Sequence, residues 1–293
     1  MQENYRPRRS VLYMPGSNAR ALEKAQTLAA DALILDLEDA VAPAEKTAAR
    51  DLVAGAVRSG SYGNRELVVR INGLDTQWGE ADLEAACAAA PDAILVPKVE
   101  SAAQVRDIEQ RISVHGAPAN VAIWAMMETP LGMLNAAEIS AASPRLGVLI
   151  MGTNDLVKDL HAEHTPDRLP VLTGLGLCTL AARAYGLSII DGVYNAFKDQ
   201  VGLRAACLQG KALGMDGKTL IHPAQLAVAN EIFAPDPRDV ARAHRYVEAF
   251  KQAQAEGKGV AVVDGRIVEN LHVANAERLI AMSQAIEGRQ AAE

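Results

Sequence analysis

The sequence is poor in aromatic residues and cysteines, and it has no long apolar segment. Phe, Trp and Tyr make up 4% of the 293 residues, whereas alanine is abundant, which suits closely packed helices with short side chains. The three cysteines, Cys87, Cys178 and Cys207, are far apart and form no CxxC motif, so we expect small buried side chains rather than a zinc site. No run of about 18 apolar residues is present, and the first ten residues contain no apolar signal region. We therefore expect a cytoplasmic protein without membrane contact.

Concentrated positive charge is also absent. The formal net charge is −7, and no group of Lys and Arg residues dominates any stretch of the chain. Because phosphate-backbone binding requires clustered cations, we expect no nucleic-acid partner. An anionic small molecule stays compatible with this composition, since a few local cations suffice to bind it.

Short apolar segments of strand length recur along the first three quarters of the chain. They lie at residues 10–14, 32–38, 66–72, 93–99, 121–128, 146–152, 187–191 and 218–223. Helix-like segments such as "NARALEKAQTLAA" separate them, usually with Gly or Pro at the borders. Nearly continuous apolar strands indicate burial on both faces, as in parallel sheets. Eight such units predict an α/β fold, a (β/α)8 TIM barrel over residues 1–235. A doubly wound open sheet is the alternative, but the GxGxxG turn that it often carries is missing.

The last part of the sequence departs from this repeat. Residues 236–293 predict a long amphipathic helix, a β-hairpin with a turn at Asp264–Gly265, and a final helix from about Val273 to Ile286. We interpret this segment as an extension that contacts a neighbouring subunit.

Charged and polar residues follow the predicted strands. They are Asp36, Glu38, Asp39, Arg70, Asn72, Lys98, Glu128, Asp155, Asp191 and His222. In a barrel the C-terminal strand ends form the active site, and burying any of these groups alone would be costly. Structural alternatives stay open: Lys98, Asp191 and His222 are equally compatible with ion pairs or helix caps, and Asp155 with an N-cap.

Glu128 and Asp155 end two successive strands, in "ETPLG" and "GTNDL". Two carboxylates at adjacent strand ends suit Mg²⁺, which takes one or two protein carboxylates and leaves its other positions to water and substrate. Arg70 has the forked donors that bind a substrate carboxylate or carbonyl.

Seven motifs in order give the chain a family resemblance. They are "RRSVLYMPGSNARALEKA", "DALILDLEDAV", "VVRINGLDTQWGEADL", "PKVESA", "ETPLGMLNA", "GTNDL" and "DGKTLIHPAQ". Together they resemble the citrate lyase beta subunit family, a branch of the HpcH/HpaI aldolase superfamily that includes malyl-CoA and citramalyl-CoA lyases. The resemblance extends from Arg8 to about Ile286. It implies a TIM barrel, Mg²⁺, a CoA thioester as substrate with a 2-oxo acid as product, and a homotrimer or homohexamer.

The resemblance also implies a role for individual residues. Glu128 and Asp155 match the metal ligands, and Arg70 matches the arginine that binds substrate. Three acidic residues match the shell of metal-bound water: Asp36, Glu38 and Asp39. The backbone of Gly152, Thr153 and Asn154 is expected to hold the substrate carboxylate. Arg20 and Lys24 are candidate contacts for the CoA phosphates, or solvated charges of the first helix.

One position departs from the pattern of malyl-CoA-type lyases. These enzymes carry an aspartate after the C-terminal hairpin, where it reaches a neighbouring active site, but the matching residue here is Glu269 in "DGRIVENL". The sequence therefore predicts a Mg²⁺-dependent lyase that cleaves a 3-hydroxy-3-carboxyacyl-CoA to acetyl-CoA and a 2-oxo acid, with Glu269 transferring the proton. Four alternatives stay open. They are a malyl-CoA thioesterase with the same site, a citrate lyase beta (citryl-CoA lyase) subunit, a non-catalytic subunit or acyl-transfer partner within a citrate lyase complex, and a metal aldolase of free acids, which the family branch disfavours.

Overall fold

The computed structural model describes residues 5–292, and its centre is a closed barrel of eight parallel strands. The strands pair in sequence order, and β1 closes the barrel against β8. Their bounds are β1 (Ser10–Pro15), β2 (Ala32–Asp36), β3 (Glu66–Arg70), β4 (Ala93–Val96), β5 (Ala122–Met127), β6 (Leu146–Met151), β7 (Ser188–Asp191) and β8 (Gly217–Leu220). Each predicted strand is present, so the barrel is confirmed and the open sheet is wrong.

Alternate residues of the strands fill the barrel interior. The filling residues include Val11, Ala32, Ile34, Val68, Ala93, Leu95, Trp124, Met126, Val148, Ile150 and Ile190. Because successive side chains of a strand point to opposite faces, the remaining strand residues face the surrounding helices. All five residues of β2 are buried. This two-sided burial explains why the strands lack a polar alternation in the sequence.

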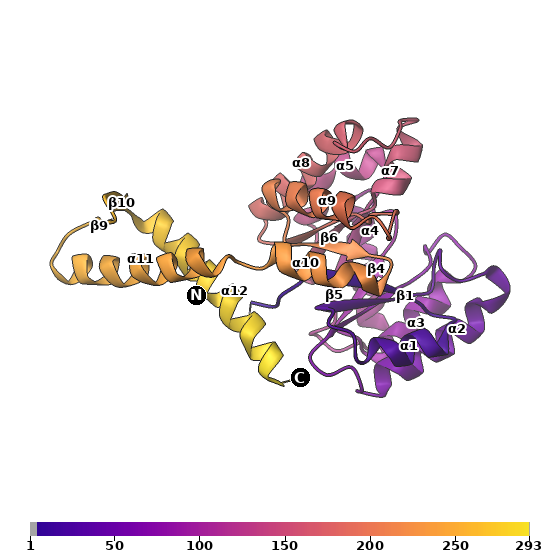
Figure 1. Cartoon of the computed structure of the whole chain (residues 1–293). Helices are drawn as coiled ribbons and strands as arrows, with labels where there is room; N and C mark the ends of the chain where they lie inside the picture. Colours follow the sequence, from indigo (N-terminus) through magenta and orange to yellow (C-terminus); the bar gives the residue numbers. More distant parts are fainter. Residues whose placement is uncertain (1–4, 293) are drawn as a thin grey trace. The chain divides into compact units, whose positions relative to one another are not determined.

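Helices surround the strands, as Figure 1 shows. In the barrel they are α1 (Ala19–Ala25), α2 (Lys46–Arg58), α3 (Gly79–Ala89), α4 (Ala102–Val114), α5 (Pro130–Leu134), α6 (Ala136–Ser140), α7 (Thr153–Asp159), α8 (Leu172–Ala184), α9 (Gln200–Ala212) and α10 (Leu226–Phe233). Short 3₁₀ turns lie at Pro43–Glu45, Leu169–Val171 and Pro223–Gln225. The three cysteines are buried, as expected. Within residues 5–292, no helix is both long enough and apolar enough to cross a membrane.

Ion pairs close the N-terminal end of the barrel. Arg8 binds Glu66 through two nitrogens at 2.7 and 2.8 Å, and Arg9 binds Asp31 at 2.8 and 2.9 Å. The Arg8 guanidinium also lies 5.4 Å from the ring of Trp124 in the core. These charges satisfy one another, which is typical of the barrel end that serves stability.

The C-terminal segment belongs to a second compact unit. Arg8–Glu231 form the barrel unit, and the chain on either side of it forms the other. The second unit contains α11 (Pro237–Ala255), β9 (Ala261–Val263), β10 (Arg266–Val268) and α12 (Asn270–Ala292), and Figure 1 shows the hairpin between the two helices. Asp264 and Gly265 have φ values of +50° and +74°, as a tight hairpin turn requires. The hairpin is confirmed, and α12 begins three residues before the predicted Val273.

Asp191 is held in an ion cluster between the barrel and its helices. Its carboxylate is fully buried and accepts hydrogen bonds from Lys218 Nζ at 2.7 Å and Arg168 Nη1 at 2.6 Å. A Cβ on Gly210 of α9 would lie 2.8 Å from Asp191 Oδ2, so the carboxylate faces that helix. The structural alternative for Asp191 therefore holds.

This cluster yields a stability prediction. Asp191→Asn leaves the buried Lys218 and the half-buried Arg168 without a counter-charge, so we expect a loss of about 3–5 kcal/mol in the free energy of unfolding. Lys218→Met should cost less, because Asp191 keeps Arg168. The exposed pair Arg204–Glu231 supplies the control, since Arg204→Gln should change stability by less than about 0.5 kcal/mol. Urea unfolding measures all three variants, and equal losses in Asp191→Asn and Arg204→Gln would refute the prediction.

Candidate active site

A cavity of about 320 Å³ opens at the C-terminal ends of the strands. It is lined by Tyr13, Asp36, Asp39, Ala40, Arg70, Met126, Glu128, Met151, Gly152, Thr153, Asn154, Asp155, Val193, Asn195, Thr219 and Ile221. Most side chains that the sequence predicts for the site thus border one cavity, because parallel strands bring their carboxyl ends together.

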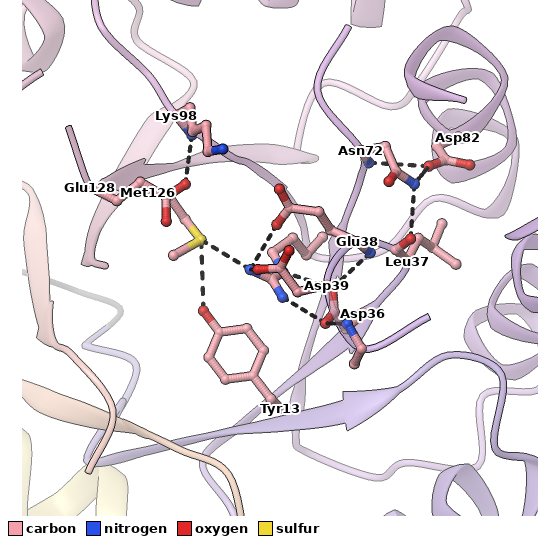
Figure 2. A network of polar contacts seen from close by, with 12 residues as sticks. Tyr13, Asp36, Leu37, Glu38, Asp39, Asn72, Asp82, Lys98, Met126 and Glu128 are labelled. Carbon is pink, nitrogen blue, oxygen red and sulfur yellow. Dashed lines mark hydrogen bonds and ion pairs between the residues drawn. The ribbon is translucent and has the colours of Figure 1, made fainter. Parts of the chain in front are cut away.

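Arg70 and Asp36 form a tightly held ion pair at this cavity, and Figure 2 labels Asp36 beside Glu38 and Asp39. Arg70 Nε and Nη2 donate to the two oxygens of Asp36 at 2.7 and 2.6 Å, and both residues are buried. Asp36 also accepts the backbone N–H groups of Glu38 and Ala40 at 2.9 and 3.1 Å. The Arg70 guanidinium lies 4.9 Å from the Tyr13 ring. Asp36 therefore fixes the guanidinium plane, and Nη1 is the nitrogen that Asp36 leaves free for other contacts.

Two further carboxylates approach Nη1 of Arg70. Glu38 Oε2 lies 2.8 Å from it, and Asp39 Oδ2 lies 3.5 Å from it. Burial raises the pKa of Glu38 from 4.5 to about 8, although Arg70 opposes this effect. Asp39 is mostly exposed, so water screens its charge. Their assignment to a shell of metal-bound water stays a prediction.

Asn72 supports the acidic loop from behind. Lys46 Nζ, which is buried, donates to Asn72 Oδ1 at 2.7 Å and to the carbonyls of Leu37 and Glu38 at 2.9 and 2.8 Å. Asn72 Nδ2 donates to the Leu37 carbonyl at 2.8 Å and to Asp82 at 2.5 Å. Figure 2 shows the contacts of Asn72 with Leu37 and Asp82 beside the carboxylates. The loop after β2 is therefore held in place before any ligand binds.

Glu128 follows β5 and is 3% exposed. Its Oε1 accepts the backbone N–H of Lys98 at 2.8 Å. A Cβ on Gly152 would lie 2.5 Å from Glu128 Oε2, so only glycine leaves room for this carboxylate. Burial raises the pKa of Glu128 to about 7; the Lys98 hydrogen bond opposes this effect and the charge of Asp155 adds to it.

Asp155 lies in the first turn of α7 and is half-buried. The N-cap position of this helix is Gly152, and no side chain caps it, so the N-cap alternative for Asp155 is wrong. Within residues 5–292, the structure gives the Asp155 carboxylate no hydrogen bond or ion pair, and no group of three or more His, Cys, Asp or Glu side chains is arranged to hold a metal. Glu128 is buried, Asp155 is half-buried, and neither carboxylate has an ion pair within 4 Å among residues 5–292. Two such carboxylates fit a Mg²⁺ ion that completes its shell with water and substrate.

The backbone after β6 differs in detail from the prediction. The N–H of Gly152 donates to the Met127 carbonyl at 2.9 Å and is therefore occupied. Thr153 and Asn154 begin α7, where N–H groups have no partner within the helix. The side chain of Asn154 exchanges two hydrogen bonds with Asn195, at 2.9 and 3.2 Å. Of the three residues predicted to bind a substrate carboxylate through their backbone, Thr153 and Asn154 have N–H groups that are available as donors, and Gly152 does not.

The other predicted residues lie outside the cavity lining. His222 accepts the N–H of Ala224 through Nδ1 and caps the turn that follows it, so its structural alternative holds. Arg20 and Lys24 are exposed on α1, and their contact with CoA phosphates stays a prediction. Glu269 is exposed directly after β10, in the second unit, and its role is also untested.

Sequence reasoning missed Tyr13 and Asn195. Tyr13 sits within the apolar run of β1, where it looks like a core residue, yet it lines the cavity beside Arg70. Asn195 lies in the loop after β7 and has no local motif. The signal that would find it is spatial, since its partner Asn154 is 41 positions away.

Comparisons with known proteins define the class. Residues 9–223 match the model of the HpcH/HpaI aldolase/citrate lyase family, so the chain belongs to this family of enzymes, as the motifs predicted. It is 56% identical to a (3S)-malyl-CoA thioesterase from Cereibacter sphaeroides over 98% of both chains. It is 37% identical to citrate lyase subunit beta of Escherichia coli, covering 92% of this chain and 90% of the relative. The structure of CitE from Mycobacterium tuberculosis with magnesium, acetoacetate and coenzyme A superposes with a TM-score of 0.75 at 30% identity, covering 94% and 97% of the chains.

The raised pKa values predict an unusual pH dependence for the metal-free protein. A carboxyl group whose folded-state pKa exceeds its unfolded value stabilises the fold below pH 4.5, and this contribution is lost as the pH rises through 7 for Glu128 and 8 for Glu38. We expect the melting temperature in EDTA to fall between pH 5 and pH 8. Glu128→Gln should abolish part of the stability loss over this pH range, on the order of 2 kcal/mol. The exposed change Glu277→Gln should leave the loss unchanged. A steeper slope in Glu128→Gln would contradict the assignment.

The close approach of β6 to Glu128 gives a second prediction. Gly152→Ala places a methyl group against the Glu128 carboxylate and should displace it, so we expect Mn²⁺ affinity, measured by electron paramagnetic resonance, to fall by about tenfold or more. Gly147→Ala in β6, the strand that precedes Gly152, is the control, because its Cβ would meet nothing closer than Ala122 Cβ at 3.9 Å. Equal Mn²⁺ affinity in the two variants would show that Glu128 is not a ligand.

Proposed function

We propose that this protein hydrolyses the thioester of (3S)-malyl-CoA, with Mg²⁺ held by Glu128 and Asp155. The observation that carries the proposal is the 56% identity, over nearly the full length, to a (3S)-malyl-CoA thioesterase. Sequence reasoning alone placed the lyase first and the thioesterase second. The cavity chemistry suits either activity, because both begin by binding the same 3-hydroxy-3-carboxyacyl group.

The chain's residues have distinct parts in this proposal. Bound Mg²⁺ would supply Lewis-acid charge for the hydroxyl and carboxylate of the malyl group. Arg70, fixed by Asp36, directs Nη1 at the same oxygens. The N–H groups of Thr153 and Asn154 bind the terminal carboxylate. Arg20 and Lys24 contact the CoA phosphates. Asp36, Glu38 and Asp39 bind water around the metal site.

Hydrolysis requires a base for the attacking water, and Glu269 is our candidate. A neighbouring subunit of a homotrimer or homohexamer would deliver it after the hairpin. Water adds to the thioester carbonyl carbon as Glu269 accepts its proton, the C–S bond breaks, and the thiolate leaves with a proton to give malate and CoA.

A lyase is the second candidate, favoured by the identity to citrate lyase subunit beta. In that reaction the bond between the hydroxyl-bearing carbon and the CH2 next to the thioester breaks. The hydroxyl loses its proton and becomes the carbonyl of glyoxylate, and protonated Glu269 gives a proton to the CH2 carbon of the thioester enolate. The products are then acetyl-CoA and glyoxylate rather than malate and free CoA.

Product analysis separates these functions. Purified protein with Mg²⁺ and (3S)-malyl-CoA should release free thiol and malate in equal amounts, without glyoxylate. Stoichiometric acetyl-CoA and glyoxylate would select the lyase. No turnover of malyl-CoA by the purified chain would refute both activities for it and favour a subunit that needs partners.

Glu269 variants test the proton-transfer assignment. Glu269→Gln should lower kcat by about 10²-fold or more, because it cannot exchange a proton, and Glu269→Asp should retain part of the activity. Glu277→Gln is the matched control, because Glu277 is an exposed glutamate on α12, the helix that begins directly after Glu269. Equal kcat in Glu269→Gln and Glu277→Gln would remove Glu269 from the mechanism.

A further inference from the structure

Lys98 adopts a backbone conformation that side-chain-bearing residues rarely use. It follows β4 with a φ of +48°, in the left-handed region, although it is not glycine. Such residues concentrate at functional sites, where the surroundings hold them in place. The motif around it, "VPKVE", is part of the family resemblance, but the function proposed above does not use this lysine.

The left-handed turn directs the backbone of Lys98 at Glu128. Its N–H donates to Glu128 Oε1 at 2.8 Å, and the following residue, Val99, donates to the Met126 carbonyl at 3.2 Å. The loop after β4 is thereby joined to the end of β5. Oε1 is occupied by this bond, which leaves Oε2 of Glu128, on the side of Gly152, for a cation.

The side chain of Lys98 is exposed at the edge of the carboxylate cluster. Figure 2 shows its ammonium on the side of Glu38 and Glu128. Partial burial disfavours its charge, but nearby anions outweigh this and raise the pKa of Lys98 above its usual value. Those anions are Asp155, Glu128, Glu38 and Asp39. The structure gives its ammonium no ion pair within 4 Å among residues 5–292, so these anions act on it without holding it.

We propose that Lys98 is a substrate-binding residue whose ammonium pairs with the carboxylate of the acyl group or 2-oxo acid, while its backbone orients Glu128. This inference rests on the proposed function, which supplies the cation and the anionic substrate. Arg70 is held by Asp36 at Nε and Nη2 and keeps only Nη1 for other partners, whereas the Lys98 ammonium has no ion pair within 4 Å among residues 5–292 and can turn toward an anion as a second cation.

A single positive charge at this place has two opposite effects. It repels a divalent cation at Glu128 and Asp155, and it attracts an anionic ligand. Removing the charge should therefore tighten metal binding and weaken anion binding. A residue with a purely structural role would weaken both, because it would disorder Glu128.

Three substitutions separate the ammonium from the backbone. Lys98→Met removes the charge and keeps the length, Lys98→Arg keeps the charge, and Lys98→Gly removes the side chain but suits the left-handed turn. We expect Lys98→Met to lower the Mn²⁺ dissociation constant by about three- to tenfold and to raise that of glyoxylate on the Mn²⁺-loaded protein by a similar factor. Lys98→Arg should resemble the wild type. Lys98→Gly should bind Mn²⁺ and glyoxylate like Lys98→Met, and it should melt at a higher temperature than the wild type, because glycine adopts the left-handed turn without strain.

Electron paramagnetic resonance measures Mn²⁺ binding, and calorimetry measures glyoxylate binding. Unchanged constants in Lys98→Met, or two constants that move in the same direction, would overturn the inference while leaving the proposed function intact. A Lys98→Gly variant that binds both ligands like the wild type would also overturn it, because the backbone alone would then suffice. Wild-type protein that binds no Mn²⁺ would overturn the inference and the proposed function together.

Discussion

The constraint on which this site depends is an excess of carboxylate charge at the barrel mouth. Four of the carboxylates border the cavity, and Glu38 lies beside them on Arg70. Asp36 by itself occupies two of the three nitrogens of the Arg70 guanidinium group. The charge that remains near Glu128 and Asp155 is reflected in the raised pKa of Glu128. Either protons or a cation must offset it, because two like charges in a partly dry site cannot both ionise without cost. We expect this excess to favour a bound cation at the mouth and to destabilise the protein when no cation is bound.

The two ends of the barrel solve the problem of buried charge differently. At the N-terminal end Arg8 and Arg9 each meet a carboxylate through two nitrogens, so the charges there are balanced. At the C-terminal end the supporting network does not neutralise all of the carboxylates. Lys46 and Asn72 use their polar atoms to hold carbonyls and side chains of the loop after β2, which fixes where the carboxylates lie without neutralising them. Carboxylates that are fixed in place but not neutralised are preorganised to bind a ligand of opposite charge.

Much of this could be predicted from the sequence, and the limits are physical. Strand positions and the barrel followed from apolar runs, because burial on both faces leaves a continuous pattern. The position of Glu128 and Asp155 at the cavity could be predicted because both residues follow the ends of strands. The partners of Asp191 could not be predicted, since Lys218 lies on β8 and Arg168 lies in the loop before α8, and only the fold brings them to Asp191. The left-handed backbone of Lys98 was equally hidden, because no glycine marks it. Pairing between distant loops, as in Asn154 and Asn195, leaves no local pattern in a single sequence.

Hydrolysis and C–C cleavage make the same demands on most of this mouth. Both need the acyl carboxylate and hydroxyl held near a cation, and both build negative charge on oxygen as the reaction proceeds. They differ in where a proton must go: from a water molecule in one case, to a carbon in the other. Glu128 and Asp155 are poor candidates for that transfer if they bind the cation, because a ligating carboxylate must stay deprotonated. In the proposed reaction the outcome would therefore depend on a group outside the proposed metal site. Glu269 is our candidate for that group, and its side chain is about one methylene longer than the aspartate of the lyase pattern.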